Sequence, residues 1–174
     1  MKYFRLGQDD REDQYLTIKG LINLPCFQQI KQGDISGLPK SNSYMVVSSY
    51  SDKLPNILSN QLFMVTRDIF ALIQLFLGEV DYRCMFLVNR RRNIEKFYYI
   101  PQLPLINCLS SQCKSNLDKS HFTKIVIKRE RYPDIFRISN VKDRVIIISL
   151  PLQRAFFDVT LRVFNLNRYG LKNN

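Results

Sequence analysis

The side chains that most often carry catalysis are few in this sequence, and their spacing completes no reaction centre. The single histidine, His121, lies in a polar segment shortly after Cys113. A nucleophile–histidine pair also needs an oxyanion-binding segment, and no glycine-rich turn accompanies these two residues. We therefore expect a non-enzymatic protein, with an enzyme built on scattered carboxylates as the open alternative.

Metal and cofactor motifs give the same expectation. Cys108 and Cys113 are close enough in sequence to resemble half of a zinc site, with Asp118 and His121 as nearby further candidates. A second ligand pair is missing, so thiols are favoured over a metal site. The glycines form neither a dinucleotide-binding nor a P-loop motif. We expect no metal, no cofactor and four free thiols, at Cys26, Cys84, Cys108 and Cys113.

Positive charge is the strongest functional signal. The formal net charge is +11, and residues 1–87 are balanced, so the whole excess lies in residues 88–174. A basic surface attracts acidic proteins or nucleic acids. Near these basic residues lie the aromatic residues Phe97, Tyr98, Tyr99 and Tyr132. The candidate partner-binding residues are Arg90, Arg91, Arg92, Lys128, Arg129 and Arg131.

Two similar strand–cap–helix units must position these residues. An apolar strand over 62–65 is followed by Thr66 and a helical stripe, and a strand over 145–148 is followed by Ser149 and a second stripe. The hydroxyl residues are predicted to cap the helices, and the apolar stripes to face a core. The stripes consist of Ile69, Leu72, Ile73 and Phe76, and of Leu152, Ala155, Phe156, Val159 and Val163.

The remaining segments have mainly β character. Residues 84–89 and 96–100 predict a hairpin around Arg90–Asn93, and residues 135–138 and 145–148 predict a second one. A short strand is expected over residues 3–6 and a strand over 124–128, whereas 107–123 resembles a Ser-rich loop. Short strands and turns are expected over 15–43.

These elements predict a single α+β domain over residues 1–174, with a mostly antiparallel or mixed sheet and two amphipathic helices. A division into two lobes, 1–105 and 121–174, joined by the Ser-rich segment, is left open. The longest apolar runs are far too short to cross a membrane, and no signal peptide is recognised. We expect a cytoplasmic protein that does not act on membranes.

The pattern resembles a large bacterial family of immunity proteins that neutralise polymorphic toxins. The resemblance covers roughly residues 40–170. It is carried by Met64–Thr66 and Ile148–Ser149, by Phe97–Ile100, and by the ending Ile135–Ile138, Val145–Ser149, Leu161–Phe164 and Tyr169–Gly170. It implies a non-enzymatic α+β domain that binds and blocks a cognate toxin, whose surface we expect to be acidic.

The alternative is a basic nucleic-acid-binding accessory protein that uses the same half of the chain. Arginines contact phosphates and aromatic rings stack on bases in such proteins. If the toxin meets another surface, the acidic segment Asp9–Asp13 is the next candidate. The identity and activity of the toxin lie beyond the sequence.

Overall fold

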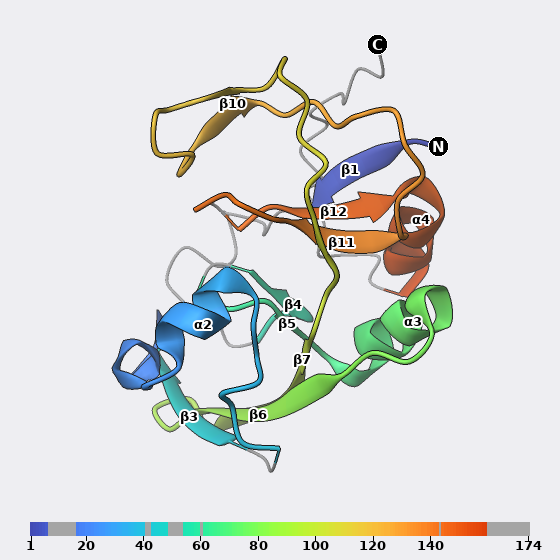
Figure 1. Cartoon of the computed structure of the whole chain (residues 1–174). Helices are drawn as coiled ribbons and strands as arrows, with labels where there is room; N and C mark the ends of the chain where they lie inside the picture. The colour runs from blue at the N-terminus through green and yellow to red at the C-terminus, as the bar shows by residue number, and fades with distance from the viewer. Residues whose placement is uncertain (7–16, 41–42, 49–53, 60, 143, 160–174) are drawn as a thin grey trace.

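Two β-sheets lie one above the other in the computed structural model (Figure 1). The structure describes residues 1–6, 17–40, 43–48, 54–59, 61–142 and 144–159. The smaller sheet has the strand order β1-β12-β11-β8. Its strands are β1 (Tyr3–Leu6), β12 (Ile146–Ser149), β11 (Ile135–Ile138) and β8 (Leu105–Ile106).

The larger sheet has the order β2-β3-β6-β7-β5-β4 and is mixed, because β3 pairs with β6 in parallel. A separate hairpin, β9 (Lys114–Ser115) with β10 (Phe122–Lys124), lies beyond the smaller sheet. The strands of the larger sheet are β2 (Thr17–Ile18), β3 (Ser43–Ser48), β6 (Tyr82–Asn89), β7 (Ile94–Pro101), β5 (Met64–Val65) and β4 (Ile57–Leu58).

The helices cover the sides of these sheets. A 3₁₀ turn, η1 (Leu21–Asn23), leads into α2 (Phe27–Gln32), which lies over the larger sheet. The longer helices, α3 (Arg67–Leu77) and α4 (Leu150–Val159), contact each other on one side of the molecule (Figure 1). The chain is a single small α+β domain with mixed sheets, as the sequence predicts.

Three apolar clusters alternate with the sheets. Strand β12 shows why: Ile146 and Ile148 enter the cluster between the two sheets, whereas Ile147 enters the cluster under the β9–β10 hairpin. Successive strand residues point to opposite faces, so a strand buried on both faces is apolar throughout. The third cluster lies between the larger sheet and α2, and contains Met85 and Tyr98.

Both predicted strand–cap–helix units are present, but only one hydroxyl acts as a cap. Ser149 Oγ accepts a hydrogen bond from Leu152 N at 3.4 Å and donates to Asp134 Oδ1. Thr66 occupies the N-cap position of α3 without a side-chain capping hydrogen bond, which corrects the prediction for this residue. Gly78 ends α3 as expected.

Several local predictions are wrong. Helix α2 forms where turns were expected, between Cys26 and the left-handed Gly33, because burial of Ile30 stabilises a helix too short for a sequence stripe. The Ser-rich segment forms the β9–β10 hairpin, whose turn is held by Asn116 and Ser120. No continuous strand forms over 124–128, where one was expected: Lys124 is the last residue of β10, and Ile127 forms an isolated bridge with Leu109.

Two arginines, Arg137 in β11 and Arg144 before β12, donate hydrogen bonds to backbone carbonyls of the chain that forms and covers the larger sheet. Arg137, 6% exposed, donates to the carbonyl of Lys31 at the end of α2, where a cation is favoured. Arg144 donates to the carbonyls of Ser59 at 3.0 Å and Gln61 at 2.8 Å. Since β1 also pairs with β12, the smaller sheet unites both ends of the described chain. The two-lobe division at 105 and 121 remains a prediction.

Gly33 should be required at the α2–Arg137 contact. Its φ is +95°, and a Cβ there would lie 2.7 Å from Arg137 Nη1. Gly33→Ala is expected to lower the free energy of unfolding by about 1–3 kcal/mol, measured by denaturant titration. Gly20→Ala is the control, because Gly20 has φ +78° but open space around it. Equal losses in both variants would show that the Arg137 contact contributes nothing.

Ser149→Ala should destabilise the protein by about 0.5–2 kcal/mol, because it removes the cap of α4 and leaves Asp134 without this donor. Thr66→Ala is the matched variant, since its hydroxyl makes no capping bond to α3. Thermal unfolding of both variants measures the difference. A larger loss for Thr66→Ala would contradict this assignment of the caps.

Candidate functional site

Arg90, Arg91 and Arg92 form the exposed turn of the β6–β7 hairpin, as predicted. The strands are paired without interruption from Tyr82 opposite Pro101 to Asn89 opposite Ile94. The turn is closed by a hydrogen bond from Arg92 N to the carbonyl of Asn89, at 3.2 Å. We call Arg90–Arg92 the arginine tip; it is displayed on a firmly paired hairpin.

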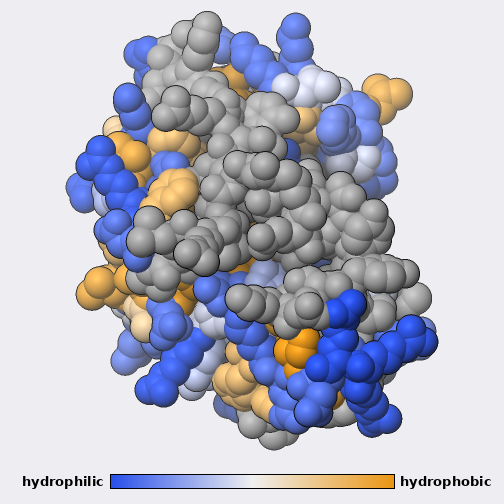
Figure 2. All heavy atoms as spheres, turned by 180° about the vertical axis from the view of Figure 1, so that it is seen from behind, coloured by the Kyte–Doolittle hydropathy of each residue, from blue (hydrophilic) through white to orange (hydrophobic). Residues whose placement is uncertain are grey.

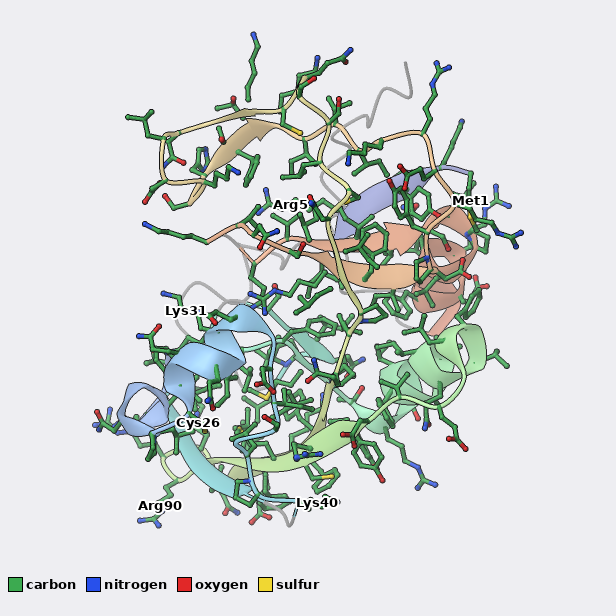
Figure 3. All side chains as sticks on the ribbon, viewed as in Figure 1. Met1, Arg5, Cys26, Lys31, Lys40 and Arg90 are labelled. Carbon is green, nitrogen blue, oxygen red and sulfur yellow. The ribbon has the colours of Figure 1, made fainter. Side chains whose placement is uncertain are left out.

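The second basic set lies elsewhere. Lys128, Arg129 and Arg131 are exposed in an irregular segment between the Ile127 bridge and β11, and Lys128 and its neighbours border a groove with Met1. Figure 3 shows Met1 and Arg90 at opposite ends of the molecule. The two sets therefore do not form one surface, because the arginine tip belongs to the larger sheet and the second set leads into the smaller one.

A row of aromatic rings runs along one face of the β6–β7 hairpin toward the arginine tip. Phe70 of α3 stacks on Tyr99, with ring centroids 4.6 Å apart. Tyr99 contacts Phe97 edge-on at 5.2 Å, and Phe97 lies 6.5 Å from Phe86. Tyr82 closes the other end, 4.9 Å from Phe70. These residues, Phe70, Tyr82, Phe86, Phe97 and Tyr99, are called the aromatic row.

The aromatic row is partly open to solvent. Phe86, Phe97 and Tyr99 are half-buried, and Tyr82 is 42% exposed. In Figure 2, apolar and hydrophilic side chains lie side by side at the lower end of the molecule, where Figure 1 places β3 and β6. Rings next to arginines can bury apolar area and pair with anionic groups on a partner.

Sequence reasoning found only part of this surface. Phe97 and Tyr99 were expected beside the basic residues, but Tyr98 points to the opposite face and donates its hydroxyl to the Pro55 carbonyl. Tyr132 is buried with Phe136, so it is not available for stacking on a ligand. Phe86 was not singled out, because the sequence of β6 is apolar from Cys84 to Val88 and does not alternate. Only the structure distinguishes its faces: Arg83, Met85, Leu87 and Asn89 are buried, and the intervening residues are not.

The residues that were weighed as a metal site have other roles. His121 is exposed, and its backbone N–H donates to Asn116 Oδ1. Hydrogen bonds from Ser120 and Lys142 lower the pKa of Asp118 to about 2, and Lys142 Nζ lies 3.1 Å from its carboxylate. Within the part of the chain that the structure describes, no three His, Cys, Asp or Glu side chains are grouped as metal ligands.

The four cysteines are free thiols. Cys108 is buried, and burial raises the pKa of its thiol to about 11. Cys113 is partly exposed, and its Sγ contacts the backbone of Val126 at 3.1 and 3.2 Å. A thiol that stays protonated at neutral pH is a poor nucleophile, so Cys108 is suited to packing.

Asp9–Asp13, the alternative acidic site, lies outside the described residues. None of the helices among the described residues is long and apolar enough to cross a membrane. Comparisons with protein-family models, curated proteins and solved structures gave no significant match.

Alkylation should distinguish the thiols. Cys108 is expected to react with iodoacetamide more slowly than Cys26, Cys84 and Cys113 at pH 8, because it is buried and protonated. Peptide mapping by mass spectrometry after timed labelling measures the four rates. Labelling in denaturant is the control, and all four residues should then react; fast native labelling of Cys108 would contradict its placement.

Proposed function

We propose that this chain is a non-enzymatic, cytoplasmic immunity protein that binds and inhibits a cognate bacterial toxin. The observation that carries the proposal is that the aromatic row and the arginine tip belong to one hairpin, with three cross-strand pairs between Phe86–Phe97 and the turn. Aromatic residues and arginine are enriched at protein–protein interfaces, where they provide most of the binding energy.

The scaffold suits an inhibitor. Four of the five rings lie on the paired strands β6 and β7, and each contacts another ring of the row, so little conformational freedom is left to lose when a partner binds. The arginine tip carries three positive charges at the end of the same hairpin. A partner with an acidic surface would be captured faster and selected over basic proteins. The resemblance to immunity proteins supplies the class of partner.

The second candidate function is binding of single-stranded nucleic acid, and the same aromatic row favours it. Bases stack on half-exposed rings while arginines contact phosphates. The two functions differ in what they select. An inhibitor recognises one protein, whereas a stacking surface accepts unrelated oligonucleotides, with a strong salt dependence.

Charge reversal at the arginine tip should slow capture of the toxin. Arg91→Glu is expected to reduce the association rate by about tenfold and to change the dissociation rate less. Phe97→Leu keeps an apolar side chain but removes the ring, and should weaken binding about two- to tenfold. Surface plasmon resonance measures both against a toxin domain encoded beside this chain's gene.

Arg154→Glu on α4 is the matched control, because Arg154 is exposed away from the hairpin and the charge change is the same. It should leave both rates nearly unchanged. Random oligonucleotides are tested in parallel at physiological salt. Oligonucleotide binding that Arg91→Glu abolishes, without binding to any neighbouring toxin domain, would replace the proposed function with the second candidate.

A further inference from the structure

A groove opens where the beginning of β1 meets the segment before β11. Its volume is about 630 Å³, within the range of sites that hold small ligands or several peptide side chains. It lies at the end of the molecule opposite the arginine tip (Figure 3). The lining residues are Met1, Tyr3, Ile127, Lys128, Arg129, Glu130 and Arg131.

The floor of the groove is fixed by hydrogen bonds. The hydroxyl of Tyr3 donates to the carbonyl of Tyr132 at 2.8 Å and accepts from its N–H at 3.1 Å. Tyr3 and Ile127 are both buried in the same apolar cluster. Lys128 N donates to the carbonyl of Cys108 at 2.8 Å. The backbone under the basic side chains is thus already in place before a ligand arrives.

The rim of the groove is strongly positive. Lys128, Arg129 and Arg131 contribute three cations, against one carboxylate from Glu130. Burial, together with the nearby Glu130 carboxylate, raises the pKa of Tyr132 to about 12. The Glu130 carboxylate is therefore close to Tyr132. With three cations and this one carboxylate, the rim of the groove has an excess of positive charge.

We infer that this groove binds an acidic segment of a partner protein, with Asp or Glu carboxylates paired to Lys128, Arg129 and Arg131. Met1, which is 62% exposed, provides an apolar contact for an intervening side chain. The ring of Tyr3 is only 5% exposed, so the groove offers no face on which a base could stack. This composition favours a peptide over a nucleic acid.

The inference rests on the proposed function only in taking the partner to be a protein. It adds a second recognition surface, distant from the arginine tip. A partner that contacts both surfaces would gain specificity from two separate charge patterns. The groove can be tested without knowing the toxin, which keeps the two proposals separable.

The test uses a short fluorescein-labelled peptide of alternating Glu and Leu, titrated with the full chain by fluorescence anisotropy at about 150 mM salt, where distant charges are screened. The double variant Arg129→Glu/Arg131→Glu should bind the peptide at least about tenfold more weakly. The double variant Lys19→Glu/Arg154→Glu is the matched control, because both residues are exposed, neither lines the groove, and the charge change is the same. It should bind the peptide within about twofold of the unmodified chain.

The double variant should keep its melting temperature, because both arginines are exposed. A peptide of alternating Lys and Leu should not bind. Equal weakening by Lys19→Glu/Arg154→Glu, tighter binding of oligothymidine than of the acidic peptide, or no peptide binding would each overturn the inference. Peptide binding without toxin binding would keep the groove and reject the proposed function.

Discussion

A contact between the buried Arg137 and the end of α2 joins the two sheets, beside the apolar cluster that they share. A guanidinium from a central strand of the smaller sheet donates to a carbonyl of a helix that covers the larger sheet. Burying a charged group is costly unless its hydrogen bonds are made. The two sheets are therefore held in one relative position, in which Gly33 leaves room for the side chain. Arg144 makes the same kind of link to Ser59 and Gln61.

This position also determines how the positive charge is distributed. The sequence places its whole charge excess in one half, which favours a single basic surface. In the structure, the β6–β7 hairpin ends at one extremity and residues 128–131 lie at the other. The distribution of charge along the sequence therefore does not predict its distribution on the surface, because segments from the same half of the chain belong to different sheets.

Sequence patterns predicted the elements whose apolar spacing and turn residues lie within the element itself. The β6–β7 hairpin and the β11–β12 pair have alternating or continuous apolar runs and turn residues between them, and both were predicted. Helix α3 has a stripe that includes Ile69 and Ile73, and it ends at Gly78 as expected. Helix α2 was missed because it is too short to show an apolar stripe. The burial of Ile30 and the hydrogen bond from Arg137 both depend on residues that no local pattern contains. The aromatic row was found only in part for the same reason, since Phe70 joins it from another element.

The pairing of β1 with β12 has a consequence for how the chain acquires its structure. Tyr3 of β1 is opposite Ser149 of β12, so β1 cannot pair until β12, near the end of the described residues, has been synthesised. Such distant pairings slow folding, because a long loop must close before the contact stabilises anything. During synthesis, the larger sheet can assemble while β1 still lacks its partner. The apolar residues Tyr3 and Leu6 of β1 stay open to solvent or to chaperones until β12 has been synthesised.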